Sequence, residues 1–147
     1  MSLKEKLMDD LKSAMKDKDT IRKNTVQMVR SAVLQFEKDN KKELDDEGVL
    51  EVVARELKRR RDVLPEYEKS GRADLLADIN REIEILLAYL PKQLTREELE
   101  AIVSDAIEKT GAASMKDMGK IMAFVMPAVK GRADGKEINA IVKEKLS

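Results

Sequence analysis

The spacing of apolar residues predicts helices throughout the chain. In residues 3–18, apolar side chains recur every three or four positions, at Leu3, Leu7, Leu11, Ala14 and Met15. This spacing places them along one face of a helix. Similar apolar faces run through residues 21–40, 46–64 and 74–90. No stretch alternates apolar and polar residues as a half-buried strand does. The pattern therefore predicts an all-α protein.

Three shorter helices are predicted in the C-terminal third. The first has a complete start signal, because Thr95 and Glu98 have the spacing of a capping box. Gly111 marks its end, since glycine adopts the left-handed conformation that closes many helices. The second covers residues 114–129. The third begins at Asp134, which is expected to cap it.

Prolines are expected to interrupt two of the longer helices, because the ring removes an amide donor and clashes with the preceding turn. Pro65 should end or kink the third helix, and Pro91 should end the fourth. Residues 92–94 then form the predicted domain boundary. The expected fold is all-α, with an N-terminal bundle of about four helices in residues 1–91 and a smaller three-helix domain in residues 93–147.

The amino-acid composition limits the kinds of catalytic or binding site that the chain can contain. The 147 residues carry 29 cations and 29 anions, so the net charge is zero. Cysteine and histidine are absent, which excludes thiolate chemistry, cysteine zinc sites and the commonest neutral-pH acid or base. Tryptophan is absent too, and the few aromatic residues argue against a base-stacking platform. No pattern of a nucleophile with its base appears. We expect no catalytic residues, no metal and no cofactor.

The hydropathy pattern indicates no membrane segment. The longest apolar run, residues 121–129, contains Pro127 and is about half the length that a bilayer requires. The N-terminal residues are too charged for a signal peptide. We therefore expect a cytoplasmic protein without a membrane partner.

An unusual turn follows this apolar run. Residues 129–136 contain Gly131 and Gly135 together with Lys130, Arg132 and Lys136. One interpretation is an anion site, in which exposed amides and cations hold a phosphate. The other is a helix connection, with Gly131 in the left-handed conformation and Asp134 as the N-cap. From the residues alone the connection is favoured, because the Asp134 carboxylate competes for the same amides.

Two further features have alternative interpretations. Four methionines, at positions 115, 118, 122 and 126, are predicted to be core, although such a stripe can also form an adaptable partner surface. The basic run at residues 58–61 is predicted to be a solvated, ion-paired surface. Its alternative is an RNA contact, which three cations of the second helix would extend: Arg22, Lys23 and Arg30.

Residues 118–146 resemble the signature of the GatB/YqeY family. The matching residues are Met118-Gly119-Lys120, Met126-Pro127, residues 129–136, Asn139 and Val142-Lys143, with weaker likeness in residues 88–94 and in Arg22, Thr25 and Met28. The resemblance implies a two-part all-α fold of the free-standing YqeY type. The same signature closes the B subunit of glutamine-dependent tRNA amidotransferase, where it helps to engage tRNA. Ala128 and Gln27 depart from it, since family members often have cations there.

The leading hypothesis is a non-catalytic module that binds tRNA or a tRNA-amidotransferase or synthetase complex; no DNA partner is expected. The phosphate contacts would be made by the cations, and the glycines would allow close backbone approach: Lys120, Lys130, Gly131, Arg132, Gly135, Lys136 and Lys143. The alternatives are a protein-interaction module without RNA binding, or an accessory to a carbon–nitrogen ligase that uses glutamine as amido donor. Catalysis by the chain alone is not expected.

Overall fold

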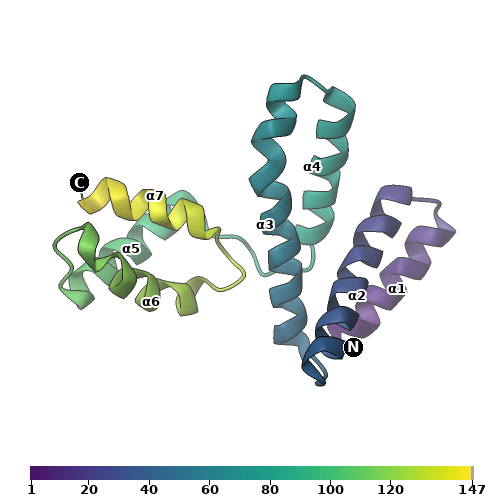
Figure 1. The fold of residues 1–147 in the computed structure, drawn as a ribbon, viewed down its shortest axis with the longest axis horizontal. Coiled ribbons are helices and arrows are strands. Elements are labelled where there is room, and N and C mark those ends of the chain that lie inside the picture. The colour runs from purple at the N-terminus through teal and green to yellow at the C-terminus, as the bar shows by residue number, and fades with distance from the viewer. Residues whose placement is uncertain (147) are drawn as a thin grey trace. The chain divides into compact units, whose positions relative to one another are not determined.

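The computed structural model describes residues 1–146, which contain α-helices α1 to α7, one short 3-10 helix η1 and no strand (Figure 1). The all-α prediction is confirmed. The chain divides into two compact units, Met1–Leu90 and Pro91–Ser147. The first unit holds α1 to α4, and the second holds η1 and α5 to α7.

The N-terminal unit consists of two helical hairpins, α1 with α2 and α3 with α4 (Figure 1). Helix α2 packs against both helices of the second hairpin. Short connections join the helices, as in bundles of antiparallel neighbours. The helices are α1 (Leu3–Lys16), α2 (Thr20–Asn40), α3 (Asp46–Ser70) and α4 (Ala73–Leu87).

Local capping explains where these helices begin. Ser2 and Glu5 form a capping box at the start of α1. Asp19 accepts a hydrogen bond from the Arg22 amide at the start of α2, and Asp45 caps α3 in the same way. Each cap satisfies amides that have no partner inside the helix.

Helix α3 does not end at Pro65. It runs on to Ser70 and stops at Gly71, whose φ is 70°. The expectation that Pro65 ends the helix is therefore wrong. The proline costs one intrahelical hydrogen bond, and packing of α3 against α4 offsets that cost.

The N-terminal core contains one buried ion pair. Its apolar part comes from all four helices and includes Leu7, Val29, Val53 and Leu86. Arg60 is also buried, and its Nη1 atom lies 2.9 Å from Oε2 of buried Glu56. The basic run that contains Arg60 was predicted to be a solvated surface, and for this residue the prediction is wrong. Intrahelical spacing of four residues lets the pair enter the interior together.

The C-terminal unit packs α5 against both α6 and α7. Its elements are α5 (Arg96–Thr110), η1 (Met115–Asp117), α6 (Met118–Val129) and α7 (Gly135–Leu146). The predicted capping box of Thr95 and Glu98 is present, and α5 stops at Gly111 as expected. The core is formed by Leu99, Val103, Ala106, Ile121, Val125, Val129, Ile138, Ile141 and Val142.

The methionines of α6 do not form its buried face. Ile121, Val125 and Val129 recur every four residues and are fully buried, which turns that side of the helix inward. Met118 and Met122 lie at the edge of the core, while Met115 and Met126 are 39% and 41% exposed. The prediction of a methionine core is therefore wrong for Met115 and Met126.

Candidate nucleic-acid interface

The basic turn is a capped connection between α6 and α7. Gly131 has a φ of 74°, and the Arg132 amide donates to the Val129 carbonyl at 2.8 Å. Asp134 Oδ1 accepts from the Lys136 amide at 3.0 Å and caps α7. The favoured interpretation of this turn is confirmed. The aspartate occupies an amide that the anion-site interpretation required.

Three hydrogen bonds attach the turn to the segment before α5. The Leu94 amide donates to the Arg132 carbonyl at 2.8 Å, and Gln93 Nε2 donates to the Gly131 carbonyl at 2.8 Å. Arg132 Nε in turn donates to the Lys92 carbonyl at 3.1 Å. Arg132 is therefore half-buried and helps to hold the turn. The sequence reasoning did not identify Gln93, whose only signal was its place in residues 88–94.

The remaining cations separate into two groups. Lys136 and Lys143 are exposed and lie seven residues apart on α7, hence on one face and about 10 Å apart along the axis. Lys130 is exposed where α6 ends, at the start of the same turn. Lys120 lies ten residues earlier, roughly 15 Å away along α6. Lys136 and Lys143 thus share a face of α7, Lys130 precedes the turn that leads into this helix, and Lys120 is separate from them.

Carboxylates lie close to two of the predicted contact residues. Hydrogen bonds from Thr95 lower the pKa of Glu98, and the charges of Lys92 and Arg132 add to this effect. The amides of Ala113 and Ser114 lower the pKa of Asp117, with a contribution from the charge of Lys120. Both carboxylates remain ionised at neutral pH. An anion approaching Arg132 or Lys120 would therefore meet a negative charge.

The charges of α7 are divided between two faces. Glu137 and Glu144 share one face, and Arg96 at the start of α5 forms an ion pair with Glu144. A hydrogen bond with Glu100 raises the pKa of Arg96, and the charges of Glu144 and Glu137 contribute. The acidic face of α7 is thus directed to Arg96. Lys136 and Lys143 lie on the adjacent face, opposite the buried residues of the helix.

Comparison with known protein families shows to which family the chain belongs. The family described as Yqey-like protein matches residues 4–146. The chain belongs to this family. The resemblance identified in the C-terminal signature is thereby confirmed, and the family accounts for almost the whole chain.

Three relatives show how far the similarity extends. Altered inheritance of mitochondria protein 41, mitochondrial, of Kluyveromyces lactis is 37% identical over 130 residues, which cover 82% of this chain and 70% of that protein. Its namesake in Pyrenophora tritici-repentis is 24% identical over 95% of this chain and 78% of its own. The B subunit of the aspartyl/glutamyl-tRNA(Asn/Gln) amidotransferase of Bifidobacterium animalis is 43% identical over 54 residues, which cover 37% of this chain and 11% of that protein.

The two fungal relatives contradict the expected cytoplasmic location. The fungal family members carry names that place them in mitochondria. The expectation was wrong because it rested on composition and hydropathy, and a charge-balanced helical domain suits either compartment. Within residues 1–146, no helix combines the length and apolar character needed to cross a membrane, and no three acidic side chains gather as metal ligands would.

Proposed function

We propose that this YqeY-family chain is a non-catalytic module that binds tRNA or a complex that handles tRNA. The observation that carries the proposal is the outward basic face formed by Lys136 and Lys143 on α7, with Lys130 at the adjoining turn. The similarity to part of an amidotransferase whose name specifies tRNA supports this class of partner. The proposal concerns binding alone and assigns no transamidation chemistry to the chain.

The seven predicted residues have different roles in this proposal. Lys130, Lys136 and Lys143 contact phosphates directly. Arg132 and Gly131 maintain the shape of the turn, since both are held to residues 92–94. Gly135 presents an open surface, because a Cβ built there meets no atom within 4 Å. Lys120, in the first turn of α6, makes a separate and weaker contact.

Salt dependence tests the proposal directly. Binding of a tRNA transcript is measured at about 50 and 200 mM salt, with the wild type and with Lys136→Ala/Lys143→Ala. Each lost phosphate contact lowers the slope of log affinity against log salt by about 0.7 to 0.9. We therefore expect the double variant to bind at least about tenfold more weakly at low salt, with a slope that is less steep by about 1.4 to 1.8.

A matched variant controls for net charge. Lys109→Ala/Lys116→Ala removes two exposed lysines of the same unit that do not lie on α7. Its affinity and salt slope should stay close to the wild-type values. Equal losses in the two double variants would show non-specific attraction, and equal weak binding by all three proteins would contradict the proposal.

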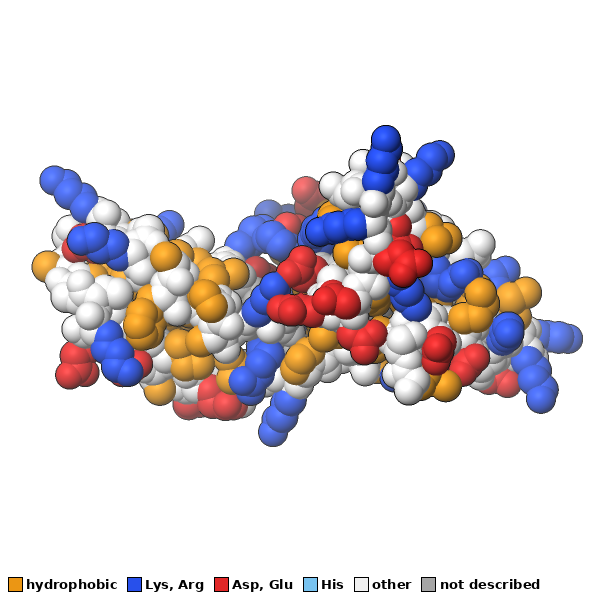
Figure 2. All heavy atoms as spheres, turned by 90° about the horizontal axis from the view of Figure 1, so that it is seen from below, with side chains coloured by type: hydrophobic (Ala, Val, Ile, Leu, Met, Phe, Trp, Pro, Cys, Tyr) orange, Lys and Arg blue, Asp and Glu red, His pale blue; other side chains and the backbone are white. Residues whose placement is uncertain are grey.

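A protein-interaction function is the second candidate, and helix α6 favours it. Its twelve residues include no carboxylate, yet Phe124 and Met126 are 42% and 41% exposed. Figure 2 shows hydrophobic side chains gathered over one face of the C-terminal unit. Large apolar side chains exposed on a helix outside its core-facing side are candidates for contact with a partner. The test is whether a protein that stays bound to the wild type at high salt fails to bind the Phe124→Glu variant. Such a loss, with the affinity for tRNA unchanged, would favour this function.

A further inference from the structure

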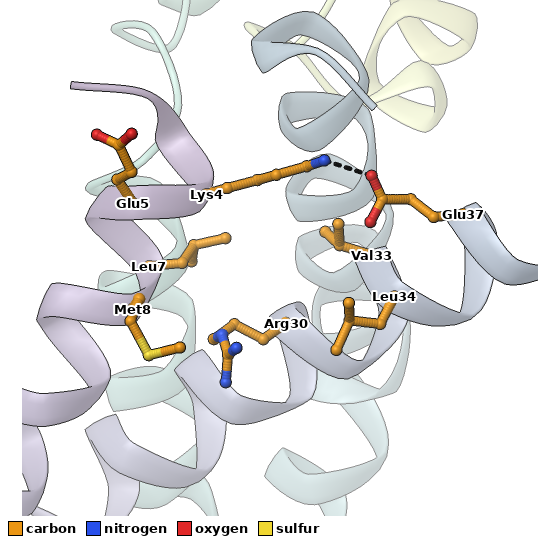
Figure 3. A pocket seen from close by; sticks show the side chains of 8 residues that line it. All are labelled: Lys4, Glu5, Leu7, Met8, Arg30, Val33, Leu34 and Glu37. Carbon is orange, nitrogen blue, oxygen red and sulfur yellow. Dashed lines mark hydrogen bonds and ion pairs between the residues drawn. The ribbon is translucent and has the colours of Figure 1, made fainter. Parts of the chain in front are cut away.

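A pocket of about 290 Å³ opens between α1 and α2 of the N-terminal unit. We call it the α1–α2 pocket; Figure 3 shows the residues that line it, which are Lys4, Glu5, Leu7, Met8, Arg30, Val33, Leu34 and Glu37. Leu7 and Val33 are buried and form its floor, whereas Leu34 is 57% exposed at its edge. The pocket therefore combines an apolar interior with charged groups at the rim.

Both carboxylates of the rim already have partners. Glu5 accepts from the Ser2 amide in the capping box of α1. Glu37 pairs with Lys4 across the mouth of the pocket and also accepts from the Leu44 amide at 2.8 Å. The hydrogen bond from Lys4 is the main cause that lowers the pKa of Glu37, so this carboxylate stays ionised.

Arg30 is different. Its side chain extends from α2 toward Met8 of α1, is half-buried, and has no hydrogen-bond or ion-pair partner among residues 1–146 (Figure 3). A guanidinium group beside an apolar surface binds carboxylates well, because its planar donors match the two oxygens. The lining thus holds one unpaired positive charge above an apolar floor.

The size and charge of the pocket define the ligand. Its volume equals that of about ten water molecules, near the lower limit of about 300 Å³ for small-ligand sites. We infer that the α1–α2 pocket binds an aliphatic monocarboxylate, whose carboxylate pairs with Arg30 and whose chain lies on the apolar floor. A free aliphatic acid and the C-terminal leucine of a polypeptide both present this chemistry.

A pair of matched ligands tests whether binding depends on a carboxylate that pairs with Arg30. Octanoate and octanol have the same chain but differ in the carboxylate. For ligands of about ten non-hydrogen atoms, a dissociation constant of roughly 1 mM is expected, which amide chemical shifts in a nitrogen-15 NMR titration can follow on the full chain. Octanoate should bind about tenfold or more tightly than octanol, with the largest shifts in residues 4–8 and 30–37.

Three substitutions separate the contribution of the Arg30 charge to ligand binding from that of apolar contact. Arg30→Gln should reduce octanoate affinity to the level of octanol and leave octanol unchanged. Leu34→Ala should weaken both ligands by similar factors, because it removes only apolar contact. Lys12→Gln is the control, since Lys12 is exposed one turn beyond Met8 and outside the pocket; it should change neither affinity. Far-ultraviolet circular dichroism checks that every variant is folded.

The two sources of the ligand are distinguished with a short peptide ending in Leu-Leu, as the free acid and as the C-terminal amide. Tighter binding of the peptide acid than of octanoate assigns the pocket to a polypeptide terminus, and the reverse assigns it to a free acid. Equal affinities of wild type for octanoate and octanol, or an equal response of both to Arg30→Gln, would overturn the inference. The tRNA measurements do not depend on this result.

Discussion

At the scale of single residues, burial gives several polar groups a role that their neighbours in sequence do not reveal. Tyr89 is 9% exposed and donates its hydroxyl to Asp10, a residue 79 positions earlier. Glu56 and Arg60 are buried together, and Arg60 also approaches Glu82 of α4 at 3.4 Å. Their spacing on α3 could be read from the sequence. Their burial could not, because it depends on α2 and α4.

Breaking the Glu56–Arg60 pair should destabilise the N-terminal unit. Glu56→Ala leaves the Arg60 charge buried without its main partner, at a cost of about 3 to 5 kcal/mol. Arg59→Ala is the control: the same carboxylate is its partner at 3.3 Å, but its side chain is 74% exposed. It should cost at most about 1 kcal/mol. Urea unfolding measures both, and equal effects would contradict a buried pair.

Tyr89 should make stability fall at high pH. The pKa of Tyr89 lies well above its ordinary value. Burial of the ring is the main cause, and the hydrogen bond to Asp10 and the charge of Asp10 add to it. The unfolded chain therefore releases this proton at about pH 10, while the folded chain keeps it. Above that pH, the free energy of unfolding should fall by about 1.4 kcal/mol per pH unit. In urea unfolding, Tyr89→Phe should lack this component.

At the scale of elements, the turn between α6 and α7 shows which glycine has a conformational task. Gly131 has a positive φ, which costs other residues about 1 to 2 kcal/mol. Gly135 is the first residue of α7 and has open space around it. The left-handed Gly131 and the start of the helix after Asp134 follow from local rules, so the sequence predicted them, whereas the open space around Gly135 is seen only in the structure. The hydrogen bond from Gln93 to the Gly131 carbonyl was not predictable, since the two residues are far apart in sequence.

The two glycines should respond oppositely to alanine. Gly131→Ala is expected to destabilise the C-terminal unit by about 1 kcal/mol or more, because the new side chain is strained at a positive φ. Gly135→Ala should be neutral or stabilise by up to about 1 kcal/mol, since alanine favours the helix. Amide signals of α5 and α7 in a thermal NMR series report the unit directly. Equal loss in both variants would contradict this assignment of roles.

At the scale of the whole molecule, a net charge of zero does not mean that positive and negative side chains are evenly mixed on the surface. The net charge is zero, yet α7 carries lysines on one face and glutamates directed to Arg96 on the next. The lysines could be named from the sequence as candidate contacts. Which of the candidate cations lie near a competing carboxylate, as Arg132 does near Glu98 and Lys120 near Asp117, required the neighbouring segments to be in place.

We propose that the two compact units are also separate folding domains. Residues 1–90 contain a core drawn from four helices, whereas the C-terminal core is smaller. Small domains bury a lower fraction of their surface and are marginal. Expressed alone, residues 1–90 should keep their helical circular dichroism and unfold cooperatively, and residues 91–147 should melt at a lower temperature. Loss of helix in isolated residues 1–90 would contradict this proposal.

The sequence alone determined the helices, most of their caps and the left-handed Gly131. These features depend on residues within about four positions of one another, where spacing and backbone chemistry act directly. Only the tertiary structure decided that α3 passes Pro65, that Met126 lies outside the core, that Arg132 holds the turn and that Arg30 lines a pocket without an ion-pair partner among the first 146 residues. Each of these outcomes depends on a segment distant in sequence, whose packing outweighs local preference.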